Sequence, residues 1–176
     1  MDKFYHGTDL DSAKNICDNG IDLHASSFSN DFGPGFYLTD DFERAKKWAI
    51  RKANSRSTKA AIVTVLFDFN SAAPFIEKFS DDLRWARFVI NNRNGGEYIK
   101  VVPFKDNNLD CRYDMTYGRV ADLDVTDIAD ELQTEKRMIT ESEIRQILNP
   151  KYPIQLVLHS ELAKSFVVKT SYSSSF

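Results

Sequence analysis

The turn at residues 33–35 (Gly-Pro-Gly), directly followed by Phe36–Thr39, constrains the fold of this chain more than any other feature. Its two glycines allow a sharp bend and a close approach to a neighbouring surface, because they carry no Cβ. The aromatic and β-branched composition of Phe36–Thr39 predicts a short strand. Side chains alternate along a strand, so Phe36 and Tyr37 are expected on opposite faces of the sheet.

The position of this turn also limits the fold class. It precedes a strand, whereas a dinucleotide-binding fold carries its glycine-rich turn between a strand and the following helix. The residue patterns predict further strands at 3–8, 60–69, 111–118, 154–159 and 165–171, and helices at 11–19, 40–54, 80–92, 125–132 and 140–148. Because these elements do not alternate strictly, the sequence predicts an α+β domain with mixed or antiparallel sheets. Residues 60–69 are expected to form a central strand.

Polar side chains and glycines mark the expected ends of the helices. Short polar residues cap a helix by accepting hydrogen bonds from its first N–H groups, and Gly20 is expected to end the first helix. The predicted caps, in chain order, are Asp9 or Asp11, Asp40 with Glu43, Ser80, and Thr140 with Glu143. Residues 91–97, which contain two adjacent glycines, are predicted to form a turn.

Composition favours a single folded domain over residues 1–176, with a serine-rich tail at 171–176 that is expected to fray. The net charge of −3 argues against nucleic acid as a partner. No apolar run is long enough for a signal peptide or a membrane span, so a cytoplasmic protein without a membrane partner is expected. Cys17 and Cys111 are too few for a zinc cluster or a disulfide framework, and no metal is expected.

A second feature near the N-terminus pairs with the glycine turn. His6 ends a predicted strand, Gly7 exposes its backbone N–H and C=O, and Thr8 adds a hydroxyl. A glycine backbone offers the adjacent donor and acceptor that a carboxamide needs, and Tyr37 offers an aromatic face to a flat cationic ring. The nicotinamide ring of oxidised NAD has both properties. Taken separately, each feature is more commonly a tight turn or an ordinary strand.

These residues carry a resemblance to a known superfamily. Residues 5–8 (Tyr-His-Gly-Thr) and 33–39 resemble the first two motifs of ADP-ribosyltransferases of the His-Tyr-Glu type, the polymerase-like class. More closely, the chain is similar to DUF3990, a bacterial family of small proteins assigned to that superfamily. The matching stretches are 5–8, 12–13, 20–23, 31–39, Ala45 with 48–49, 88–89 with 92–93, 113–118, 121–122 and 155–156. The resemblance implies an ADP-ribosyltransferase-like fold with split sheets.

The resemblance also implies roles for individual residues. His6 would hold hydroxyls of the adenosine-side or the nicotinamide-side ribose. Gly7 would grip the carboxamide with help from Thr8, and Tyr37 would stack on the nicotinamide. Trp48 would supply a second stacking ring, although a tryptophan at this helical spacing is as often part of a core. The remaining residues implied in NAD binding lie in and beside the turn: Phe32, Gly35 and Phe36.

The third motif departs from the pattern of the relatives. They place a catalytic glutamate on a late strand, and the matching residue here is Gln155. An amide oxygen can accept the same hydrogen bond from a ribose hydroxyl, but it brings no negative charge. Losing such a charge typically costs ~3 kcal/mol, about a hundredfold in rate. A Gln155→Glu change is therefore expected to raise turnover, if the missing charge limits the reaction.

Two other polar features have the residue types of a catalytic site, but each has a commoner structural explanation. A Glu-x-Glu pair is typical of arginine-specific toxins in another branch, but here Glu143 is explained by capping with Thr140, and Glu141 is favourable in a first helical turn. His159 falls on the same predicted strand face as Gln155, where a surface or core histidine is the commoner interpretation. No role follows from the sequence for the segment between Tyr113 and residue 122.

The resulting expectation is an NAD-dependent mono-ADP-ribosyltransferase with His6, Tyr37 and Gln155 as its catalytic residues. The acceptor is expected to be a protein, and the family's setting suggests a bacterial toxin held by an antitoxin protein, or a secreted effector. The alternatives are a catalytically weak NAD-binding module or an NAD glycohydrolase, an RNA 2′-phosphotransferase, and a pure interaction protein. The acidic composition argues against the phosphotransferase, which needs a basic cluster.

Overall fold

The computed structural model describes residues 1–25, 30–80, 82–93, 107–121, 125–147 and 152–176, and it has a mixed α+β architecture. The strands are β1 (Asp2–Asp9), β2 (Phe36–Thr39), β3 (Ala60–Phe67), β4 (Ile76–Lys78), β5 (Met115–Arg119), β6 (Ile154–Leu158) and β7 (Val167–Ser173). The helices are α1 (Leu10–Asn19), α2 (Phe42–Arg56), α3 (Phe69–Ala72), the 3-10 turn η1 (Ala73–Phe75), α4 (Leu83–Arg93), α5 (Val125–Glu135), α6 (Glu141–Ile147) and α7 (Glu161–Lys164). The predicted turn beyond Arg93 and residue 122 lie outside the described residues.

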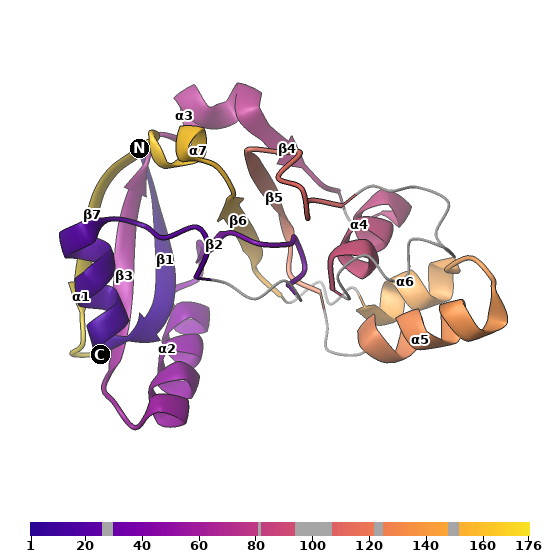
Figure 1. Ribbon diagram of the computed structural model, residues 1–176, viewed down its shortest axis with the longest axis horizontal. Coiled ribbons are helices and arrows are strands. Elements are labelled where there is room, and N and C mark those ends of the chain that lie inside the picture. Colours follow the sequence, from indigo (N-terminus) through magenta and orange to yellow (C-terminus); the bar gives the residue numbers. More distant parts are fainter. Residues whose placement is uncertain (26–29, 81, 94–106, 122–124, 148–151) are drawn as a thin grey trace.

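The strands form one sheet in the order β4-β5-β6-β2-β1-β3-β7, rather than the separate sheets that the sequence suggested (Figure 1). Among the described strands, β4 and β5 are the only parallel pair, so the sheet is mixed. β1 pairs with β3 from Asp2↔Phe67 to Asp9↔Ala60, but it pairs with β2 only at Tyr5↔Thr39. The sheet therefore has two well-paired halves that are joined by a single residue pair.

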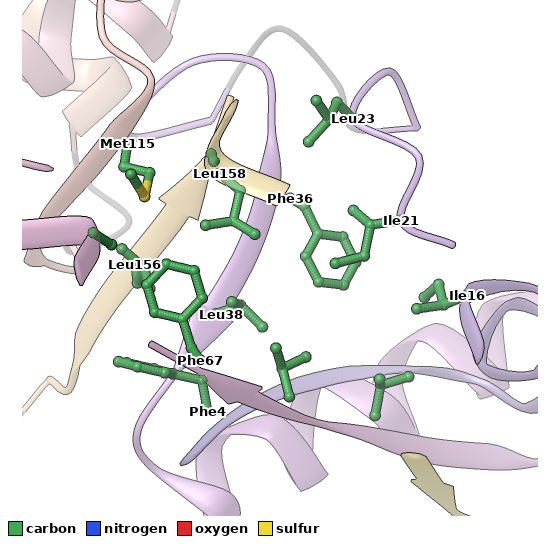
Figure 2. Packing of buried hydrophobic residues seen from close by; sticks show 14 of the residues in the cluster. Phe4, Ile16, Ile21, Leu23, Phe36, Leu38, Phe67, Met115, Leu156 and Leu158 are labelled. Carbon is green, nitrogen blue, oxygen red and sulfur yellow. The ribbon is translucent and has the colours of Figure 1, made fainter. Parts of the chain in front are cut away.

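Helices cover both faces of the half that contains β1 and β3. Ala45 and Ala49 of α2 pack with Ile62 on one face. Ala13 and Ile16 of α1 belong to the large cluster on the other face (Figure 2). That cluster continues across the join to Phe36 and Leu38 of β2 and to strands β5 and β6. Apolar packing thus bridges the two halves where backbone pairing is sparse.

A second large cluster lies at the other end of the sheet, where α4, α5 and α6 gather beyond β5 (Figure 1). Trp85, Phe88 and Phe32 have no exposed surface within it. Tyr37 packs against this cluster, whereas its neighbour Phe36 belongs to the first one. The predicted alternation of faces along β2 is therefore confirmed.

The helix caps agree with the sequence in part. Asp9 accepts a hydrogen bond from Ser12 N at 2.9 Å, and Thr140 and Glu143 bond each other's backbone as a capping box. The prediction for α2 was wrong by one residue, because Asp41 rather than Asp40 accepts from Arg44 N. Adjacent acidic residues are equally good caps by type, so the path of the chain decides between them.

The caps and ends of later elements also differ from the sequence prediction. Helix α4 begins at Leu83, and the carboxylate of Asp82 accepts from Trp85 N at 3.0 Å in the place predicted for Ser80. The tail expected to fray from residue 171 is paired with β3 as far as Ser173↔Ile62. The ring of Phe176 lies edge-on against Phe42, with 6.4 Å between the ring centroids.

Short elements are the ones that sequence periodicity missed. Strand β4 and helices α3 and α7 span three or four residues each, too few to show a period. The long strand predicted at 60–69 is confirmed as β3, which lies between β1 and β7. In the part of the chain that the structure describes, no helix is long and apolar enough to cross a membrane.

Candidate functional site

His6 lies on β1 next to the sparse join between the two halves of the sheet. Its Nδ1 lies 2.8 Å from the backbone oxygen of Tyr37 on β2, and its ring stacks on Phe36 with 4.3 Å between centroids. A carbonyl oxygen only accepts hydrogen bonds, so Nδ1 carries the proton and Nε2 is left as an acceptor. Within the described residues, no donor reaches Nε2. The N-terminal motif and the glycine-turn motif therefore meet here.

The imidazole of His6 is held in its neutral form. The pKa of His6 is lowered to about 4, chiefly by burial and in smaller part by the nearby ammonium of Lys52. The hydrogen bond to Tyr37 and the carboxylate of Asp9 act in the opposite direction but do not outweigh burial. At neutral pH the side chain therefore offers a lone pair at Nε2 rather than a positive charge.

Tyr37 is anchored to the turn that precedes it. Its hydroxyl donates to Gly33 O at 2.6 Å and accepts from Phe32 N at 3.1 Å. Burial, with the neighbouring carboxylate of Asp31, raises its pKa well above the ordinary value, so the phenol stays protonated. The phenol lies on the opposite face of the sheet from the imidazole of His6, which packs beside Phe36. The two motifs touch through the Tyr37 backbone, not through their rings.

The glycines are explained by close packing. A Cβ on Gly7 would lie 1.9 Å from the backbone oxygen of Ala45, so this position must be glycine for α2 to lie against β1. Gly33 has a φ of +81°, which favours glycine. A Cβ on Gly35 would lie 2.7 Å from both His159 Nδ1 and Leu158 O. The turn is therefore pressed against the end of β6.

Three further residues predicted to bind NAD have different environments. Phe32 has no exposed surface and packs between Phe79 and Phe88, so its ring supports the turn from within the core. Thr8 is buried on β1. Trp48 is 48% exposed on α2, with the guanidinium of Arg51 5.2 Å from its ring centroid. Within the described residues, the ring of Trp48 contacts neither His6 nor Tyr37.

Gln155 is buried on β6, opposite Thr39 on β2 and Gly118 on β5. Paired residues share a face, so Gln155 lies on the same side of the sheet as Tyr37. Its Nε2 donates to Asp31 Oδ2 at 3.2 Å. The structure thus places Gln155 and the phenol of Tyr37 on one face and His6 on the other.

Asp31 and Arg93 are site residues that the sequence did not single out. The guanidinium Nε of Arg93 donates to Asp31 Oδ1 at 2.6 Å, and Ala121 N donates to Asp31 Oδ2 at 2.9 Å. Asp31, Arg93 and Ala121 all fall within the stretches that match the family pattern. Their place in these stretches could have marked them as candidates, but only the fold shows that the three segments meet at the carboxylate of Asp31.

His159 is a buried core residue, in line with the commoner interpretation. Its Nδ1 lies 2.5 Å from Pro34 O, and its Nε2 lies 2.9 Å from the hydroxyl of Thr116. Since the carbonyl must accept, Nε2 accepts from the threonine. Burial lowers the pKa of His159 to about 4. Both ring nitrogens are thus occupied in holding the turn to β5 and β6.

A family model described as "Protein of unknown function (DUF3990)" matches residues 3–167. A search of curated proteins found no match.

Proposed function

The chain belongs to the DUF3990 family, and we propose that it is an NAD-dependent mono-ADP-ribosyltransferase with an ADP-ribosyltransferase-like fold. The observation that carries this proposal is the contact between His6 Nδ1 and Tyr37 O at 2.8 Å. It joins the two motifs that resemble those of the superfamily, although 31 residues separate them. The contact also leaves Nε2 of a neutral imidazole as an acceptor for a hydroxyl group.

The residues around this contact suit the parts of NAD. The Nε2 atom of His6 can accept a hydrogen bond from a ribose hydroxyl, and the ammonium of Lys52 lies near enough to influence His6, where it can attract the diphosphate. The anchored ring of Tyr37 offers a flat aromatic surface beside Gln155 on the opposite face of the sheet. One NAD molecule would therefore have to span the join between β1 and β2, where Tyr5 and Thr39 form the single residue pair. NAD supplies the reactive bond, between nicotinamide and ribose, and the ADP-ribose is passed to an acceptor.

Each proposed residue then has a specific task. His6 holds a ribose hydroxyl and stays in its neutral form, because burial disfavours the charged imidazolium. Tyr37 stacks and does not exchange protons, because its hydroxyl is occupied by the turn. Gln155 orients a ribose hydroxyl through its amide oxygen. We propose a protein acceptor, and an antitoxin protein as a partner, on the resemblance alone.

The second candidate is an NAD glycohydrolase or a catalytically weak NAD-binding module. Gln155 favours this candidate, because its neutral amide stabilises the positive charge that develops on the ribose less than a carboxylate does. The two candidates differ in the fate of the ADP-ribose, which water captures in a glycohydrolase and a protein captures in a transferase.

The proposal is tested with NAD labelled in its adenosine part, incubated with a bacterial lysate. Nicotinamide release and label on protein are measured for the wild type, Tyr37→Ala and Tyr37→Phe. Phenylalanine keeps the stacking ring and loses only the two hydrogen bonds to the turn, so it is the matched control. We expect Tyr37→Ala to lose release and Tyr37→Phe to keep most of it.

Thermal unfolding shows whether each variant is folded. Release without labelled protein would favour the glycohydrolase. Equal release by the wild type and a folded Tyr37→Ala protein, or no release by the wild type, would overturn the proposed function.

A further inference from the structure

One carboxylate on the glycine-turn segment gathers donors from three separate elements. Asp31 is 6% exposed, and it accepts from Arg93 of α4, from the backbone of Ala121 after β5, and from Gln155 of β6. The segments that it joins lie as far as 124 residues apart in the chain. We propose that Asp31 is the positioning residue for Gln155, and this inference rests on the proposed function of the site.

The argument begins with the symmetry of an amide side chain. Rotation about the last bond of glutamine interchanges its oxygen and its nitrogen at little steric cost. A carboxylate accepts hydrogen bonds and donates none, so it selects the orientation with Nε2 toward Asp31. The opposite orientation would set an amide oxygen against a negatively charged oxygen. Asp31 therefore determines that Oε1 faces away from the turn.

The selected orientation leaves the acceptor end of Gln155 available. Within the described residues, no donor reaches Oε1, while Nε2 is held at 3.2 Å from Asp31 Oδ2. A ribose hydroxyl is a donor and needs an acceptor on the protein. By fixing Nε2, Asp31 thus presents Oε1 of Gln155 as the hydrogen-bond acceptor for the substrate, although Asp31 does not contact the substrate itself.

The same geometry explains why an amide suits position 155 in this chain. A glutamate there would place a second carboxylate about 3 Å from Asp31, where two like charges cannot both ionise freely. Arg93 already pairs with the other oxygen of Asp31 at 2.6 Å, so it balances one negative charge and not two. Asp31 and Gln155 therefore form a matched pair of acid and amide.

The test is a double-mutant cycle with Asp31→Asn, Gln155→Ala and the combined variant, scored by kcat and KM for nicotinamide release. Misplacement of a catalytic group by about 1 Å can cost up to a hundredfold, so Asp31→Asn is expected to lower kcat about 10- to 100-fold. With Gln155 already removed, Asp31→Asn should lower kcat by less than about twofold, because it acts through Gln155. Equal kcat losses in both backgrounds would overturn the inference.

Glu143→Gln is the matched control for a general loss of stability. The side chain of Glu143 is only 12% exposed, pairs with an arginine (Arg137) and accepts from the backbone N–H of Thr140, but it bonds none of the proposed catalytic residues. Glu143→Gln should lower the unfolding temperature as Asp31→Asn does and leave kcat unchanged. If Glu143→Gln lost as much kcat as Asp31→Asn, the effect of Asp31 would be structural only.

A second readout needs no activity. The side-chain NH₂ signals of Gln155 are assigned in ¹⁵N spectra by their disappearance in Gln155→Ala. Hydrogen exchange of these protons is expected to be at least tenfold faster in Asp31→Asn than in the wild type or in Glu143→Gln. Unchanged exchange would overturn the inference. If the wild type releases no nicotinamide, the proposed function fails, and this measurement alone decides the role of Asp31.

Discussion

His6 and His159 are both neutral and have the same tautomer, but they differ in the hydrogen bonds that their Nε2 atoms make. Each donates Nδ1–H to a backbone carbonyl of the second motif, at 2.8 Å for His6 and 2.5 Å for His159, and burial lowers the pKa of both to about 4. Nε2 of His159 accepts from Thr116, whereas no donor reaches Nε2 of His6 within the described residues. A fully bonded histidine stabilises the fold, and one with an open acceptor can bind a ligand.

The largest effect is expected for His159→Ala. The change removes the buried imidazole ring and leaves its two partners, Pro34 O and the hydroxyl of Thr116, without these hydrogen bonds. Each unsatisfied buried group costs about 1–3 kcal/mol, so two of them should lower the free energy of unfolding by about 2–6 kcal/mol. Urea unfolding measures this value. A loss below about 1 kcal/mol would show that the ring is not a structural connection.

His6→Ala should reverse the pattern and affect function more than stability. Loss of a hydrogen bond to a substrate ribose is expected to lower nicotinamide release about a hundredfold, equivalent to ~2.7 kcal/mol. The free energy of unfolding should fall by only about 1 kcal/mol, since one hydrogen bond is removed. His24→Ala, at an exposed histidine, is the control and should change neither value. Full activity in His6→Ala would break the comparison.

Acid should destabilise the protein through these histidines. A histidine with a folded pKa of about 4 and an ordinary pKa of 6.5 binds fewer protons folded than unfolded between these values. Stability should therefore fall as pH drops below 6.5, by about 2 kcal/mol down to pH 5 for His159 alone. His159→Gln should flatten this part of the stability curve. An unchanged slope in that variant would assign the acid sensitivity to other groups.

Trp48→Ala should have the smallest effect and shows how far the ligand site extends from His6. The ring is 48% exposed and shared with Arg51, so its removal should leave the free energy of unfolding within about 0.5 kcal/mol. If the ring stacks on NAD, KM should rise roughly fivefold, the value of an exposed aromatic contact of about 1 kcal/mol. Ile50→Ala, at another exposed apolar residue of α2, serves as the control. An unchanged KM would limit the site to β1, β2 and β6.

The structure also refines the sequence-based expectation for Gln155→Glu. The new carboxylate would lie beside Asp31. Because two adjacent negative charges repel each other, the two acids are expected to share one proton, and the pKa for its loss should be raised. Any gain in turnover should therefore appear only as pH rises through that raised pKa. Stability should be lost over the same range, because the folded state resists the second negative charge. The pH dependence of turnover and of the free energy of unfolding, measured for Gln155→Glu and the wild type, tests both trends.

The sequence predicted the long elements and the two motifs, and the features that it misplaced or missed have identifiable physical causes. β3 and the alternation along β2 follow from periodic patterns that are long or compositionally clear. The cap of α2 was misplaced by one residue because two aspartates are adjacent, and β4 was missed because three residues show no period. The single β1–β2 pair was not foreseen, since register depends on partners far along the chain.

The sequence by itself determined the α+β class, the strand after the glycine turn, and which residue types are available for binding. Local patterns are sufficient for these features, because propensity and side-chain alternation act between near neighbours. Only the tertiary structure decided that Gly7 makes room for α2, that Phe32 is a core residue, and that Asp31 meets Gln155. Hydrogen bonds and steric limits between segments up to 124 residues apart exist only once the chain has folded.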